Sequence, residues 1–261
     1  MSAFLHYIQR LDQYLFLFGE LVKRDFKKRY KRTVLGVLWS LLSPLLMLFV
    51  ISIVFSHFFG REIPHFVIYV FAGIVNFYFF TEATNNGMRS FANNAGIISS
   101  SSIPKYILTL SCNMQAFINY LLTLIIFLIF VQIDGLSFSW KYLALLFPIF
   151  CLTVFNTSVG LILASIRSVF KDAEYLYAVF TQIMLYFSAI FYCISTFATQ
   201  VQHLFHLNPL YIYITYFRMI VIESTIPPLS VHLLGVSYAF AMLGIGVFVY
   251  RKMSKKIIYF I

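Results

Sequence analysis

The sequence predicts an all-helical integral membrane protein that forms one domain over residues 1–261. Of these residues, 61% are apolar and 11% are charged. A soluble domain is usually about 45–50% apolar and about 25% charged, so the surface of a soluble protein could not be built from this chain. Uncharged stretches long enough to cross a membrane recur along the sequence, and basic residues gather between them. Because both features are typical of multi-pass membrane proteins, we expect six transmembrane helices.

An amphipathic helix is expected over residues 11–32, before the first apolar stretch. Apolar residues recur every three or four positions from Leu11 to Tyr30, which places them on one face of a helix. The stretch KRDFKKRYKR, residues 23–32, has seven lysines and arginines in ten positions. Such a helix lies in the headgroup layer, with its cations toward anionic lipid or a cytosolic partner. Nucleic acid is not an expected partner, because the cations lie only a few residues from the membrane.

Each predicted span contains about 20 mostly apolar residues, the number that crosses a hydrocarbon core of about 30 Å. The segment after the fifth span is more polar and contains Asn208-Pro209, so we expect external helices that lie in the interface or re-enter the membrane. The predicted spans are residues 34–58, 64–86, 105–132, 142–166, 174–196 and 229–250, and the external helices are residues 198–225.

The lysines and arginines predict the orientation of the chain. With both termini in the cytoplasm, the inner segments carry 16 of the 19 basic residues, and the outer segments carry only Arg61, Lys141 and Arg218. Inner loops of membrane proteins have such an excess of lysine and arginine. We therefore expect a multi-pass protein of the cytoplasmic (inner) membrane with both termini inside.

Glu82 is the only acidic residue that the predicted topology places within reach of a span, near the inner end of span 2. Ionisable residues at such depth are functional candidates. The alternative is that the carboxylate reaches the inner headgroups beside Asn85 and Asn86. Because the chain has no GxxxxGK[ST] phosphate-binding loop, it is not expected to hydrolyse nucleotide itself.

Histidines and aromatic residues offer two further hypotheses. His203 and His206 are close enough in sequence to share a metal ion, but no acidic or cysteine ligand accompanies them, so interfacial histidines and no metal are expected. Aromatic side chains make up 20% of the chain, and some could line a pathway and stack on sugar rings. The candidate pathway residues are Phe77, Tyr78, Tyr186 and Tyr192.

The segment LVKRDFKKRYKRTVLGVLWSLLSPLLML, residues 21–48, resembles the start of the type-2 ABC exporter permeases that move O-antigen, teichoic acid and capsule polysaccharides. In that family a basic helix leads through a similar pattern into the first span. We expect Gly36 to allow a close backbone approach there. The matching residues are Lys23, Arg24, Asp25, Arg29, Tyr30, Leu35, Gly36, Trp39, Ser40 and Pro44.

Four further segments resemble the family in order along the chain. They are FAGIVNFYFF (71–80), FANNAGIISSSSIPKYIL (91–108), SIRSVFKDAEYL (165–176) and LNPLYIYITYFR (207–218). The chain departs from the family at the uncharged SSSSIP of the first inner loop, which is usually basic. It also has Phe-Lys-Asp for the usual Phe-Arg-Asp, and a proline of the fifth span is replaced around Ala189.

The resemblance implies a homodimer that works with two ATP-binding-cassette subunits, which bind ATP and magnesium, so this chain needs no cofactor. It also implies an undecaprenyl-linked polysaccharide as cargo. Residues expected to couple to the ATPase are Phe91, Asn94, Ile97, Ile98, Pro104, Arg167, Phe170, Lys171 and Asp172. Residues expected at the entry of the lipid headgroup or substrate are Arg24, Lys27, Arg29 and Trp39, for which a lipid anchor and topology signal is the alternative.

Two other functions remain open on the sequence. A permease of the same fold could move small hydrophobic drugs or lipids. A polytopic enzyme that processes a prenyl-linked sugar would need a cluster of carboxylates and histidines on one face. Its candidates are His57, His65, His203, His206 and His232, near which only Glu62 and Glu223 are acidic.

Overall fold

The computed structural model describes residues 2–260 apart from 31–35, 37, 60–62 and 101–102, and the described residues form helices without a β-strand. The N-terminal half comprises α1 (Ser2–Tyr30), α2 (Leu38–Phe59), α3 (Phe66–Asn93), α4 (Ala95–Ser100) and α5 (Tyr106–Ile133). The C-terminal half comprises η1 (Trp140–Leu145), α6 (Leu146–Val169), α7 (Ala173–Phe187), η2 (Ile194–Thr196), α8 (Thr199–His206), α9 (Pro209–Val221) and α10 (Leu229–Phe260).

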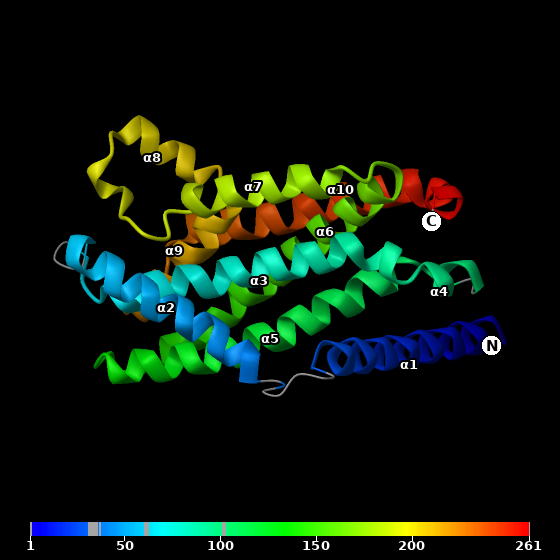
Figure 1. The fold of residues 1–261 in the computed structure, drawn as a ribbon, viewed down its shortest axis with the longest axis horizontal. Coiled ribbons are helices and arrows are strands. Elements are labelled where there is room, and N and C mark those ends of the chain that lie inside the picture. The colour runs from blue at the N-terminus through cyan, green and yellow to red at the C-terminus, as the bar shows by residue number, and fades with distance from the viewer. Residues whose placement is uncertain (1, 31–35, 37, 60–62, 101–102, 261) are drawn as a thin grey trace.

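Helix α3 lies at the centre of the bundle, packed against α5 on one side and α6 on the other, while α10 packs against α6 (Figure 1). Helix α1 lies along the inner part of α5. The two ends of the described chain lie at the same end of the molecule, beside α4 (Figure 1). An even number of crossings would produce this arrangement, and the side of the membrane on which it lies stays a prediction.

Four helical segments in the described part of the chain are long and apolar enough to cross a membrane. They are Phe66–Asn93, Tyr106–Ile133, Trp140–Val169 and Leu229–Ser254. They correspond to the second, third, fourth and sixth predicted spans. The all-helical fold is therefore confirmed, whereas the number of six crossings stays a prediction.

The helix expected over 174–196 is shorter than predicted, because α7 ends at Phe187. Its 15 residues measure about 22 Å at 1.5 Å per residue, less than the hydrocarbon core of about 30 Å. Ala189 has a φ of 48° and leaves the helical path. Asn208 donates to the carbonyl oxygen of Phe187 and to Ser188 Oγ, at 2.9 and 3.0 Å. Because these acceptors come from α7 and the donor from the segment before α9, tertiary contacts end the helix.

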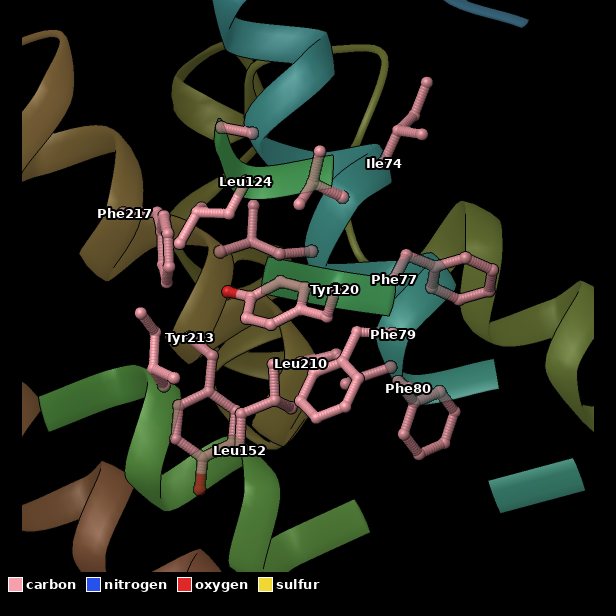
Figure 2. Packing of buried hydrophobic residues seen from close by; sticks show 14 of the residues in the cluster. Ile74, Phe77, Phe79, Phe80, Tyr120, Leu124, Leu152, Leu210, Tyr213 and Phe217 are labelled. Carbon is pink, nitrogen blue, oxygen red and sulfur yellow. The ribbon is translucent and has the colours of Figure 1, made fainter. Parts of the chain in front are cut away.

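Helix α9 lies in the range predicted for external helices, but protein covers it on nearly every side. Asn208 caps it by accepting a hydrogen bond from Leu210 N at 3.0 Å, and Pro209 occupies its first turn. Tyr213 and Phe217 of α9 point into the main core, beside Leu152 of α6 (Figure 2). The position of α9 relative to the bilayer stays a prediction.

Gly36 precedes α2 and has a left-handed φ of 50°. A Cβ atom built on it would meet nothing within 4 Å, so the expected close backbone approach does not occur among the described residues. Glycine suits this position because the backbone adopts a conformation that side chains with a Cβ disfavour.

Candidate functional site

The two inner segments predicted to couple to an ATPase come together at one end of the bundle. A cavity of about 280 Å³ lies between them, and Phe91, Arg167 and Lys171 are among the residues that line it. Phe91 is buried in a cluster against which Ile97 and Ile98 of α4 pack. The turn between α3 and α4 therefore rests directly on α6, although about 70 residues separate these segments in the sequence.

Glu174 joins three helices at this end. Its two carboxylate oxygens accept hydrogen bonds from Arg89 Nε of α3 and Arg167 Nε of α6, each at 2.8 Å. Glu174 precedes the apolar part of α7, and the hydrogen bond from Arg167 is the main reason why the pKa of its carboxyl lies below the usual value. Sequence reasoning missed Glu174 as a site residue, because only the fold places it between two arginines.

Arg24 and Asn94, predicted for separate roles, are in direct contact. The guanidinium of Arg24 donates to Asn94 Oδ1 at 2.7 Å and to its neighbour Asp25 at 2.6 and 2.9 Å. Asn94 is buried and also donates to the carbonyl oxygen of Ser90. Helix α1 is thereby linked to the turn that precedes α4.

The other predicted residues at this end differ in accessibility. Phe170, Lys171 and Asp172 are exposed on the turn between α6 and α7, where they are accessible to a partner. Pro104 is half-buried, and Lys27 is exposed on α1. The side chain of Arg29 lies outside the described residues.

A cavity of about 530 Å³ lies between α2, α3 and α5, and polar side chains line much of it. Glu82 of α3 accepts a hydrogen bond from Asn119 Nδ2 of α5 at 2.7 Å. Trp39, predicted at the substrate entry, and Tyr78, predicted on the pathway, both line this cavity. The structure thus brings Glu82 together with two residues that were selected for different reasons.

A second cavity of about 480 Å³ lies between α1, α3 and α5. Arg24, Lys28 and Asn94 line it toward the inner end, and Glu82 lines it as well. Because Glu82 belongs to the lining of both cavities, they adjoin each other at this residue. We call the first the upper cavity and the second the lower cavity.

The remaining pathway candidates are dispersed. Phe77 is 5% exposed and belongs to the main core, whereas Tyr186 is 63% exposed on α7. Tyr192 lies beyond the end of α7 and donates a hydrogen bond to the carbonyl oxygen of Tyr186 at 2.6 Å. These three residues do not share a cavity with Glu82.

Arg218 of α9 is a buried charged residue, which sequence reasoning counted as an outer cation and as the last residue of the family-like segment 207–218. Its guanidinium donates to the carbonyl oxygens of Tyr69, Ala189 and Ile190 at 3.2, 3.0 and 3.0 Å. It also lies over the ring of Tyr69, 3.4 Å from the centroid. A cavity of about 660 Å³ adjoins it.

The outer histidines do not form one site. His65 pairs with Asp134, and His232 Nε2 is 2.7 Å from Tyr216 Oη. The rings of His203 and His206 are 6.4 Å apart between centroids. Among the described residues, no group of three potential metal ligands occurs. The side chain of His57 lies outside the described residues.

The sequence model of the ABC-2 type transporter family matches residues 17–222. The chain belongs to this family. It is 27% identical over 216 residues to the O-antigen export system permease protein RfbA of Klebsiella pneumoniae, covering 82% of this chain and 83% of that protein. It is 25% identical to RfbA of Myxococcus xanthus over 84% of this chain and 85% of that one. The polysialic acid transport protein KpsM of Escherichia coli is 20% identical over 72% of this chain and 74% of its own length.

The match to the ABC-2 type transporter family includes both inner turns and every residue that lines the upper and lower cavities. The family consists of membrane proteins, and several apolar helices of this chain agree with that. Membership therefore makes the chain a multi-pass membrane protein of transporter type. It favours a permease over the alternative of a prenyl-sugar-processing enzyme.

Proposed function

We propose that this chain is the membrane-spanning subunit of an ABC transporter that exports a lipid-linked polysaccharide of O-antigen type across the inner membrane. ATP hydrolysis on separate nucleotide-binding subunits drives the transport. The observation that carries the proposal is the similarity to two O-antigen export permeases over more than four fifths of the chain. The arrangement of the inner end and of the two polar cavities supports it.

The ATPase docks on the inner end, in this proposal, where two turns from distant parts of the chain adjoin. Exposed Phe170, Lys171 and Asp172 provide an apolar and a charged contact for the partner. Glu174 ties this turn to α3 and α6, so a displacement of the turn moves three helices together. Two copies of the permease and two ATPase subunits make up the transporter.

The cargo enters from the inner leaflet beside α1. The exposed Lys27 and the half-exposed guanidinium of Arg24 attract the pyrophosphate of the lipid carrier. The lower cavity adjoins Arg24 and offers amide groups from Asn93, Asn94 and Gln115. Such a lining suits a hydrated, polar headgroup.

The rival cargo, a small hydrophobic drug or a simple lipid, fits these cavities poorly. Glu82, Asn85 and Asn119 line the upper cavity, and an apolar molecule there would leave their polar groups without solvation. Sugar hydroxyls can donate to all three and accept from the two amides. The lining therefore favours a glycan.

Deletion of this chain tests the function directly. We expect the loss of surface polysaccharide, its accumulation inside the cell, and restoration by the intact gene. We also expect a chain with a phosphate-binding loop to co-purify with the tagged permease in mild detergent. Normal surface polysaccharide together with altered drug sensitivity would establish the rival cargo instead.

A further inference from the structure

Four polar side chains form a ridge along one face of α3. Tyr78, Thr81, Glu82 and Asn85 follow one another at spacings of three, one and three residues, which places them on one face of the helix. All four line the upper cavity. The helix presents this face toward α5 and α2.

Glu82 lies well within α3, away from both ends of the helix. The second span was expected to end at residue 86, but α3 continues to Asn93, eleven residues beyond Glu82. At 1.5 Å per residue, the carboxylate-bearing position is about 16 Å from the inner end of the helix. The upper and lower cavities are the polar environment of this carboxylate.

Helix α5 supplies the partner that orients this carboxylate. Asn119 is 3% exposed and donates to Glu82 Oε1 at 2.7 Å. Thr123, one turn further along α5, lines the same cavity and donates to the carbonyl oxygen of Asn119 at 3.0 Å. These contacts fix a carboxylate, an amide and a hydroxyl at the wall of one cavity.

The size and shape of the upper cavity suit a ligand larger than a few waters. Its volume of about 530 Å³ falls within the range of about 300–1,000 Å³ that is typical of small-ligand sites. Trp39 and Tyr78 add flat aromatic rings to the polar wall. Flat apolar rings beside hydrogen-bonding groups complement a pyranose, which has apolar C–H faces and a rim of hydroxyls.

The charges of the two cavities differ, which orients an anionic glycolipid. Arg24 and Lys28 line the lower cavity together with the acidic Asp25 and Glu82, whereas Glu82 is the charged residue that lines the upper cavity. A phosphate can therefore pair with cations in the lower cavity, whereas the lining of the upper cavity offers it a carboxylate and no cation. Uncharged sugar hydroxyls, by contrast, can accept the amide proton of Asn119 and donate to Glu82.

We propose that the upper cavity is a sugar-binding subsite within one protomer, in which Glu82 and Asn119 bind hydroxyls of the cargo's first sugar. The pyrophosphate stays beside Arg24 and Lys28 in the lower cavity. This inference rests on the proposed export of a lipid-linked polysaccharide. It adds the residues that bind the first sugar of that cargo. The subsite holds the first sugar residue before transport begins.

Accessibility of a single cysteine tests the subsite. Cys112, Cys151 and Cys193 are replaced by alanine, Thr123→Cys is introduced, and the rate of labelling by N-ethylmaleimide is measured in membrane vesicles without ATP. The vesicles come from cells that make the glycan, from cells blocked at the first sugar transfer, and from cells blocked after it. Thr215→Cys, which lines the separate cavity beside Arg218, is the matched control.

We expect Thr123→Cys to be labelled about fivefold more slowly whenever the first sugar is present, as about 80% occupancy would produce. Glu82→Gln removes a charge-assisted hydrogen bond and should weaken binding of the sugar about tenfold, which lowers the protection to about 1.4-fold, while Thr215→Cys should label equally in all vesicles. Equal rates for Thr123→Cys in all three vesicles would overturn the subsite. Surface polysaccharide, measured in the same strains, shows separately whether the chain exports glycan.

Discussion

Arg218 is a charged side chain that the fold encloses, with only 5% of its surface exposed. Its hydrogen bonds to Tyr69, Ala189 and Ile190 link α3 and the segment after α7 to α9. The guanidinium of arginine is a planar group with several N–H donors, so it can donate to three carbonyl oxygens at once. The ammonium of lysine cannot donate to all three in the same geometry. Arg218 therefore stabilises the irregular backbone at which α7 ends.

Substitution of Arg218 should destabilise the protein strongly. Arg218→Ala leaves three buried carbonyl oxygens without their donor, and we expect the free energy of unfolding to fall by about 3 kcal/mol. Arg218→Lys should recover only part of this loss. The measurement is denaturant unfolding in detergent, with the exposed Arg251→Ala as the control. Equal stability of the variants at 218 and 251 would contradict this role.

At the scale of the elements, α3 and α6 approach each other through glycines. A Cβ atom added to Gly87 would lie 2.8 Å from Gly160 Cα. Because Gly160 Cα is a backbone atom, no side-chain rotation can relieve this clash. Small residues allow this closeness between membrane helices, where packing replaces the hydrophobic effect as the main attraction. The glycine pair thus sets the distance at which the inner halves of α3 and α6 pack.

Gly87→Ala should force α3 and α6 apart. Overpacking of this kind costs about 1–3 kcal/mol of unfolding free energy, measured by the same denaturant titration. Gly244→Ala is a matched control, because nothing lies within 4 Å of its added Cβ. A loss of stability that is the same at both positions would rule out the close approach as the cause.

Glu174 is the element-scale link at the inner end, since it connects α7 to α3 and α6. We expect Glu174→Gln to fold and bind its ATPase but to lower export by about fivefold, at the weaker end of typical couplings between sites. The readouts are surface polysaccharide and ATP turnover of the purified complex. Glu20→Gln, which breaks only an exposed pair with Lys23, should export normally. Unchanged export in Glu174→Gln would show that the ion pairs carry no coupling.

On the scale of the whole molecule, the long helices connect an end rich in cations, which is the predicted inner end, to an end rich in histidine, which is the predicted outer end. The inner end contains α4, the turn from α6 to α7, and both ends of the described chain (Figure 1). The opposite end carries the turn after α5, with Phe138 54% exposed. An ATPase that acts from the cytoplasm needs accessible contacts at the first of these ends.

Phe170→Asp should separate ATPase binding from assembly of the permease. Phe170 is 47% exposed on the inner turn, and a carboxylate there would repel an apolar partner surface. We expect two differently tagged permease chains still to co-purify, with the ATP-binding chain lost. Phe138→Asp places the same change at the opposite end and should retain all partners. Retention of the ATP-binding chain by Phe170→Asp would exclude this turn as the docking contact.

Sequence reasoning recovered the helical class, four apolar segments and the inner turns, because each depends on residues that are neighbours in the chain. It ended the second span at residue 86, whereas α3 continues to Asn93, since apolar content alone does not tell where a helix ends. It also extended α7 by nine residues beyond Phe187, because the residues after this point are as apolar as those before it. The contact between Arg24 and Asn94 had no sequence signal.

The sequence by itself determined that this protein is a helical membrane protein with a basic N-terminal helix. Hydropathy and charge patterns depend only on residues that are neighbours in the chain. Only the tertiary structure decided where α7 ends, which residues Glu174 joins, and that Glu82 lies between two cavities. These features depend on hydrogen bonds and cavities formed by residues distant in sequence. Such contacts exist only once the helices have packed, so no local pattern can encode them.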